Sequence, residues 1–307
     1  MGLFWNKKKD APAVVGLYGK HPAAGDFLRY NANSPHLNSL DEWLSAALPA
    51  AQRLIPDWET FYLSAPRISF VYQDIAAKSS RCVIGSMIAS NDQSGRQFPL
   101  MIFAEIDQRM VFENYPALPH LRFFQDVNRV LAGVADLDRE SLARSVDQLV
   151  APEQPPMDDA IQAYDSFLDN TDCGSTFSTM FGLAAVSQTP KALGTLKEAC
   201  APVGSGQGLP RFGIRCPLGN DGEGGAALWL GLFQQMLPVP ILPNVIWTDR
   251  TMLIYFNKFT SKSLSALWRE DWQDATLCDL STAESGEDRV APVNLSDPLR
   301  KLFEGQG

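Results

Sequence analysis

The chain has 307 residues, of which 45% are hydrophobic and 10% aromatic, which is enough to bury a large core and excludes a disordered chain. Lys and Arg total 26 against 35 Asp and Glu, a formal net charge of −9. An acidic chain of this kind lacks the clustered cations that binding to nucleic acid requires, so we expect no nucleic-acid partner.

The first 150 residues alternate between expected strands and helices. Residues 13–20 predict a strand, which a turn-rich segment follows. Ser34 before Pro35 is typical of a helix start, and the apolar residues after it predict an amphipathic helix that Pro49 should kink or split. Short connections between the next three expected strands favour antiparallel pairing. These strands lie at 67–73, 81–89 and 98–106, and helices are expected at 121–134 and 142–150.

Beyond a proline-rich linker candidate at 151–156 the alternation resumes. The glycine-rich residues 219–225 predict a flexible turn, and residues 226–237 predict a buried helix because they are apolar on every side. From Asp279 the chain becomes polar, which predicts a loose tail with one weak helix near 298–303. The other expected elements are a helix at 158–168, a strand at 211–218, a hairpin of strands at 244–248 and 252–256, and a helix at 261–268.

These patterns divide the chain into a flexible extension at 1–12, an N-terminal α/β domain at 13–150, a second α/β half at 157–278 and a polar tail at 279–307. The extension suits either a frayed terminus or contact with a membrane surface, because three lysines follow three apolar residues. No apolar run reaches the roughly 18–20 residues that span a bilayer, so we expect any membrane contact to be peripheral or indirect. The tail is expected to be dispensable for folding, although its apolar residues allow one amphipathic turn that docks. They are Leu299, Leu302 and Phe303.

No catalytic residue, metal site or cofactor is predicted, because each chemical motif is incomplete. Residues 16–20 end in Gly-Lys, but a phosphate-binding loop needs four residues between its glycines and a Ser or Thr after the Lys. The glycines at 204–208 do not join a strand to a helix, as a dinucleotide fingerprint requires. Histidines and cysteines lack the spacing of a metal site, and Cys173 has no base nearby. Five scattered cysteines suit a reducing cytoplasm better than a disulfide framework.

Two glycine-bearing motifs resemble those of a known family. Residues 16–27 read Gly-Leu-Tyr-Gly-Lys-His-Pro-Ala-Ala-Gly-Asp-Phe, and residues 95–100 read Gly-Arg-Gln-Phe-Pro-Leu. Together they resemble TagF, a family of accessory proteins associated with type VI secretion, with Leu17 at a position where the family usually has Trp or Phe. Ser86, Ser90 and Asp92 stand where the family has a loop bearing Ser and Asp. A weaker likeness in the expected strands near 245–256 extends the resemblance over about residues 13–270.

The resemblance implies a three-layer αβα sandwich with a mixed, largely antiparallel sheet, in the cytoplasm of a bacterium. It also implies a non-catalytic, post-translational negative regulator, a repressor of the assembly of the type VI secretion system. The implied partner is the forkhead-associated (Fha) scaffold protein of that system. The alternative function is a sensor or enzyme that binds a nucleotide or another small molecule through Gly19, Lys20 and the Arg96 region.

We predict that the two motif loops form one exposed patch in which Lys20 and Arg96 supply positive charge and Phe98 anchors the patch from within. Gly25 and Gly95 are expected to adopt backbone angles that other residues resist. In the competing interpretation Asp26 caps a turn or pairs with Arg96, and the phenylalanines belong to the core. The candidate partner-binding residues are Lys20, Pro22, Asp26, Arg96 and Gln97. The residues assigned to the structural motif are Gly16, Tyr18, Gly19, Gly25, Phe27, Gly95, Phe98 and Pro99.

Overall fold

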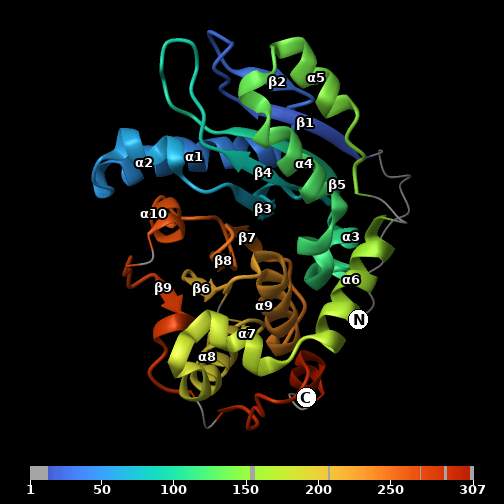
Figure 1. Ribbon diagram of the computed structural model, residues 1–307, viewed down its shortest axis with the longest axis vertical. Helices are drawn as coiled ribbons and strands as arrows, with labels where there is room; N and C mark the ends of the chain where they lie inside the picture. The colour runs from blue at the N-terminus through green and yellow to red at the C-terminus, as the bar shows by residue number, and fades with distance from the viewer. Residues whose placement is uncertain (1–12, 153–155, 207, 270, 287–288, 305–307) are drawn as a thin grey trace.

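The computed structural model describes residues 13–152, 156–206, 208–269, 271–286 and 289–304, and the predicted extension at 1–12 lies outside them. Within these residues one nine-stranded sheet has the order β2-β1-β5-β4-β3-β7-β8-β6-β9 (Figure 1). Neighbouring strands are antiparallel except for β6 and β9. The strands are β1 Val14–Gly19, β2 Leu28–Tyr30, β3 Ile68–Tyr72, β4 Arg81–Ile88, β5 Leu100–Asp107, β6 Gly213–Pro217, β7 Asn244–Trp247, β8 Thr251–Tyr255 and β9 Leu277–Asp279.

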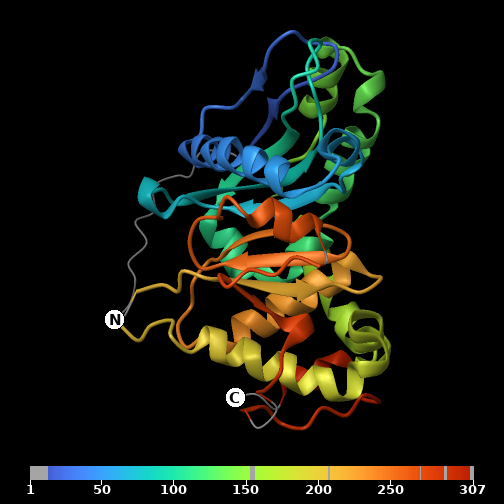
Figure 2. The same ribbon diagram turned by 90° about the vertical axis from the view of Figure 1, so that its left-hand side faces the viewer.

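Helices cover both faces of the sheet, and each layer buries its own hydrophobic cluster (Figure 2). One layer holds α1 Pro35–Leu54, α2 Trp58–Ser64 and α10 Ser263–Trp268. The other holds α3 Gln108–Glu113, α4 Arg122–Ala132, α5 Arg139–Asp147, α6 Pro156–Asn170, α7 Cys173–Phe181, α8 Ala185–Cys200 and α9 Gly222–Met236. The predicted three-layer α/β fold with a largely antiparallel sheet is therefore confirmed. No helix in the described part of the chain combines the length and the apolar character needed to cross a membrane.

Helix α1 begins where the sequence predicts, because the Ser34 side chain accepts a hydrogen bond from the backbone N–H of His36 at 3.3 Å and Pro35 occupies the first turn. The expected split at Pro49 is wrong, since the helix continues to Leu54. A proline removes only one backbone hydrogen bond. The apolar face on both sides of Pro49 is buried against the sheet and holds the helix together.

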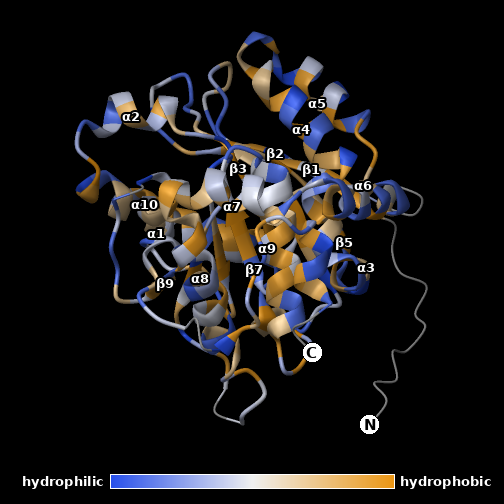
Figure 3. Cartoon of the chain, turned by 60° about the horizontal axis from the view of Figure 1, so that its bottom comes forward, coloured by the Kyte–Doolittle hydropathy of each residue, from blue (hydrophilic) through white to orange (hydrophobic). Residues whose placement is uncertain are grey.

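The expected flexible turn at 219–225 is wrong in its second half, because α9 already begins at Gly222. The Asp221 side chain caps this helix by accepting a hydrogen bond from the N–H of Gly224 at 2.9 Å. A Cβ atom at Gly222 would lie 2.8 Å from the carbonyl oxygen of Asp249. Gly222 therefore lets the helix start pack against the β7–β8 hairpin, and α9 continues within its layer as a mostly hydrophobic helix (Figure 3).

The tail after residue 279 is anchored by buried leucines within its described residues, contrary to the expectation of a loose segment. Leu280 and Leu299 are fully buried, and Leu302 is 6% exposed. The predicted turn is a short 3-10 helix, Leu299–Phe303, which docks on α6 and α9. Arg300 pairs with Asp165 at 3.0 Å and with Asp169 at 2.8 Å. A few apolar residues at the right spacing are enough to attach a segment whose composition is otherwise polar.

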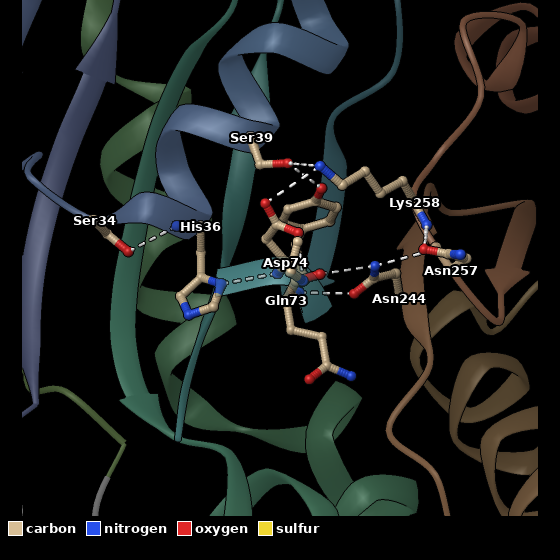
Figure 4. A network of polar contacts seen from close by, with 10 residues as sticks. Ser34, His36, Ser39, Gln73, Asp74, Asn244, Asn257 and Lys258 are labelled. Carbon is tan, nitrogen blue, oxygen red and sulfur yellow. Dashed lines mark hydrogen bonds and ion pairs between the residues drawn. The ribbon is translucent and has the colours of Figure 1, made fainter. Parts of the chain in front are cut away.

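The two predicted halves of the chain share the sheet where β3 pairs with β7. Beside this pairing the Asn244 carboxamide accepts a hydrogen bond from the N–H of Gln73 at 2.7 Å (Figure 4). The same carboxamide donates to the carbonyl oxygens of Gln73 and Asn257, each at 3.0 Å. One side chain thus ties the end of β3 to the segments that border β7 and β8.

A second set of polar contacts continues this seam toward α1 (Figure 4). The Lys258 ammonium lies 3.3 Å from the Asp74 carboxylate and donates to the Ser39 hydroxyl at 3.1 Å. The N–H of Asp74 donates to Nδ1 of the buried His36 at 2.8 Å. Residues of both halves therefore hold the start of α1 and the end of β3 in fixed positions.

Candidate functional site

The two sequence motifs meet at one end of the sheet because β1 and β5 are antiparallel neighbours. In the register of this pair Gly19 lies opposite Leu100, so the loop after β1 and the loop before β5 emerge side by side. Gly19 has a φ of +131°, and a Cβ atom there would lie 2.0 Å from the carbonyl oxygen of Pro99. Only glycine permits this approach, which explains its place in the first motif.

The centre of the site is Asp92, whose side chain is fully buried within the second loop. One carboxylate oxygen lies 3.1 Å from the ammonium of Lys20 and 2.7 Å from Nε of Arg96. The other oxygen accepts hydrogen bonds from the N–H and the hydroxyl of Ser94 at 3.0 and 2.7 Å, and from the N–H of Arg96 at 3.0 Å. Gly95 closes the turn with a φ of +81° and an N–H bond to the Asp92 carbonyl at 2.9 Å.

These contacts keep Asp92 ionised. Burial alone would raise the pKa of the Asp92 carboxyl, but hydrogen bonds from Ser94, Lys20 and Arg96 outweigh burial and hold the pKa well below its usual range. A buried carboxylate with two cationic partners is stable only while both remain in place. The ion pair with Lys20 therefore joins the first motif to the second.

Backbone contacts join the two loops along the rest of their length. Arg96 donates from Nη2 to the carbonyl oxygen of Gly25 at 2.9 Å. Gln93 donates its side-chain amide to the carbonyl of Ala23 and its backbone N–H to the carbonyl of Ala24, both at 3.0 Å. The loops therefore form one unit, which we call the paired loops and define as residues 20–27 and 90–99.

Buried groups anchor the paired loops from below. His21 is fully buried, accepts a hydrogen bond at Nδ1 from the N–H of Ala23 at 3.1 Å, and lies with Nε2 3.0 Å from the carbonyl of Val134. The rings of Tyr18, Phe27 and Phe98 pack together, with centroid separations between 4.9 and 6.1 Å. This aromatic packing attaches both loops to β1, because Phe27 and Phe98 belong to the loops and Tyr18 belongs to the strand.

The structure corrects two expectations about charge and backbone in this region. Lys20 is only 7% exposed and is paired with Asp92, so it supplies no surface charge. Arg96 keeps 60% of its side chain exposed, but its charge faces the same carboxylate. Gly95 has the expected positive φ, whereas Gly25 does not.

The other predicted residues are divided between surface and core. Pro22 and Asp26 are exposed, and the Asp26 carboxylate accepts a hydrogen bond from the N–H of Phe27 at 2.8 Å rather than pairing with Arg96. Gln97 is half-buried and accepts a hydrogen bond from the Trp58 indole at 2.6 Å. The motif residues packed beneath them are Gly16, Tyr18, Gly19, Phe98 and Pro99, which are buried, and Phe27, which is half-buried.

The sequence singled out Asp92 only as part of a loop that resembles the family's and not as a candidate binding residue, although Asp92 joins the paired loops. The signal was present in the order Asp92, Ser94, Gly95, because an Asp whose side chain binds the backbone two residues later is typical of a tight turn. The partner of that carboxylate, Lys20, is 72 positions earlier in the chain and could be found only from the strand register.

A groove of about 550 Å³ runs beside the paired loops. Its apolar margin includes Leu63, whose side chain is 60% exposed although leucine is normally buried. The groove is lined by Leu48, Pro49 and Gln52 of α1, by Trp58, Glu59 and Leu63 of α2, and by Gly95 and Gln97 of the second loop. The paired loops and this groove form a continuous surface.

The cysteines are placed as structural residues. Four of the five are buried and all are free. Burial raises the pKa of Cys173 and that of Cys278 to about 11, so both remain thiols at neutral pH. A thiol is a much weaker nucleophile than a thiolate.

Comparison with known proteins relates the chain to a family and to solved structures. Residues 16–150 match a family described as the TagF N-terminal domain, type VI secretion system-associated. Among solved structures, the chain is similar to PA0076 from Pseudomonas aeruginosa PAO1, with 26% identity and a TM-score of 0.40. The similar region covers 46% of this chain and 64% of that chain, which is less than two thirds of its length. No curated protein sequence matches the chain.

Proposed function

We propose that this chain, whose residues 16–150 match the TagF N-terminal domain associated with type VI secretion, is a non-catalytic, post-translational negative regulator of that system. It acts in the bacterial cytoplasm by binding the forkhead-associated scaffold protein, and this binding restrains assembly of the secretion machinery. The paired loops are the recognition surface.

The observation that carries this proposal is the buried Asp92, which joins two loops from distant parts of the sequence into one unit. A loop that is already held in its bound conformation loses little entropy when a partner docks. The exposed residues of the paired loops, Pro22, Asp26 and Arg96, are presented on this unit. The adjacent groove with its exposed Leu63 extends the surface available to a protein partner.

The alternative, a nucleotide sensor or enzyme that uses the Gly19–Lys20 region, has less support. A phosphate-binding lysine needs an ammonium group that is available to the ligand. The ammonium of Lys20 is buried against Asp92, and it lies 5.4 Å from the centroid of the Phe27 ring. Binding of an anion there would require the ion pair to break.

The test is binding of the purified scaffold protein to the full chain, measured by titration calorimetry. Asp26→Arg reverses an exposed charge on the paired loops without touching the Asp92 contacts, and we expect it to weaken binding at least about tenfold. Glu284→Arg reverses an exposed charge outside the loops and is the matched control. If neither variant changes the affinity, or both change it equally, the paired loops are not the recognition surface. If the unmodified chain does not bind the scaffold, the proposed partner is wrong.

A further inference from the structure

A second site lies in the other half of the chain, in a polar pocket of about 270 Å³. Four separate segments supply its walls. These are Thr179 and Met180 of α7, Arg215, Pro217, Gly219 and Asn220 on and after β6, Arg250 and Thr251 at the β7–β8 hairpin, and Asp279 and Ser281 at and after the end of β9. None of them belongs to the paired loops.

One wall of the pocket is a neutral ion pair between the buried Arg215 and the half-buried Asp279. Arg215 is 5% exposed and donates to the Asp279 carboxylate at 3.3 Å and to the carbonyl oxygens of Trp272 and Arg269 at 3.1 and 2.8 Å. The second oxygen of Asp279 accepts hydrogen bonds from the N–H and the hydroxyl of Ser281. Both charged groups are therefore saturated by the protein, and their charges cancel.

Arg250 is different, because its exposed guanidinium has no hydrogen-bond or ion-pair partner among the residues that the structure describes. Its backbone is held, since the N–H donates to the Thr248 hydroxyl at 3.2 Å and the carbonyl accepts from the N–H of Leu218 at 2.8 Å. The hairpin thus holds a cation at the pocket while leaving its five N–H donors available. Arg215, Arg250 and Asp279 together give this pocket one net positive charge on a chain whose formal net charge is −9.

The neighbouring loop adds a neutral donor. The Asn220 carboxamide lines the pocket and has no hydrogen-bond partner within the described residues. Gly219, with a φ of +71°, directs the chain close to α7, where a Cβ atom would lie 2.3 Å from the hydroxyl of Thr179. The turn that brings Asn220 to the pocket therefore requires glycine at position 219, because of the positive φ and the close approach to Thr179.

We propose that this pocket binds a phosphate monoester, with Arg250 as its principal ligand. A guanidinium makes paired hydrogen bonds to phosphate oxygens, and the remaining oxygens need further donors of the kind that Asn220 provides. A pocket of about 270 Å³ holds the phosphate group and leaves the ester chain to extend into solvent. The monoester belongs either to a small metabolite or to a phosphorylated side chain of a protein. This site is independent of the proposed function at the paired loops.

The experiment is calorimetric titration of the full chain with glycerol phosphate, with a phosphoserine peptide and with acetate, at constant ionic strength. We expect both phosphate esters to bind and acetate to bind at least about tenfold more weakly. The tighter of the two esters identifies the source of the ligand. Arg250→Ala should weaken phosphate binding at least about tenfold, because a charge-assisted pair of hydrogen bonds is lost. The side chain of Arg250 makes no contact that the fold requires, so this variant should fold.

Arg53→Ala is the matched control, since it removes another exposed arginine that has no ion-pair partner in the described structure. It should bind both phosphate esters as the unmodified chain does. The proposal is overturned if the unmodified chain binds neither ester, if acetate binds equally well, or if the two arginine variants lose binding to the same extent.

Discussion

The ammonium of Lys20 lies 3.1 Å from a carboxylate oxygen of Asp92, although both side chains are almost completely buried. Removing Asp92 leaves the Lys20 ammonium charged with little access to water, and removing Lys20 leaves Asp92 with Arg96 as its cationic partner. The pair is testable, because the stability lost on removing both members should be smaller than the sum of the losses on removing each one.

We therefore expect Asp92→Asn and Lys20→Met each to lower the melting temperature by several degrees. The double variant should lose clearly less than the sum of the two single effects, because the residues interact directly. Thermal unfolding of the three variants and the unmodified chain, followed by circular dichroism, measures the coupling. Strictly additive effects would show that the ion pair does not link the loops.

The two motif glycines should respond very differently to alanine. Gly95→Ala meets no atom within 4 Å and should cost about 1 kcal/mol, because only its positive φ is unfavourable. Gly19→Ala adds a collision with the carbonyl of Pro99 to a similar backbone cost and should be several times more destabilising. Chemical denaturation gives both free energies of unfolding, and comparable losses would contradict the packing assigned to Gly19.

His36 should make stability depend on pH. Burial lowers the pKa of His36, despite the opposing attraction of Glu105 and Asp74. The unfolded chain, with an imidazole pKa of about 6.5, then binds a proton more readily than the folded chain. The free energy of unfolding should therefore fall as the pH drops from about 6.5 to the folded pKa, and this contribution should then level off.

The control for this pH effect is His36→Asn, which keeps an acceptor for the Asp74 N–H but does not titrate. Its stability should change less than that of the unmodified chain between about pH 8 and pH 5. Identical pH profiles from denaturant titrations of the two proteins would assign the dependence to other groups.

The packed tail reverses the expectation that it is dispensable. Leu299→Ala removes a fully buried side chain and should cost about 2–5 kcal/mol, whereas Lys301→Ala, an exposed neighbour, should cost less than about 0.5 kcal/mol. Denaturant unfolding of both variants compares them directly. A Leu299→Ala protein as stable as the Lys301→Ala protein would restore the original expectation.

The elements that sequence predicted best are those with a strong local signal. Ser34 and Pro35 mark the start of α1, alternating apolar residues mark β3, and runs of mainly apolar residues mark β4 and β5. The short connections between these strands also predict their antiparallel order correctly. Each of these signals lies within the element or its immediate flanks.

The errors arise where distant contacts decide the outcome. Lys20 reads as a surface cation until the strand register places it beside Asp92. Gly222 reads as part of a flexible turn until the β7–β8 hairpin is packed against it. The polar tail reads as loose because three buried leucines contribute little to its average composition. None of these contacts can be predicted from the sequence immediately around each residue, because the contacting residues are far apart in the chain.

The outermost strands, β2 and β9, are each only three residues long. At the β2 border the chain turns away at Asn31, whose φ is +51° and whose side-chain amide covers the Val15 carbonyl oxygen at 2.9 Å. An edge strand this short gives an incoming strand little backbone to pair with, and the Asn31 side chain already covers a neighbouring carbonyl oxygen. Long open edge strands are the usual starting points of polymerisation. A protein built this way can accumulate in a crowded cell without forming fibres through its sheet. Its associations are instead left to loops and grooves, from which a partner can dissociate.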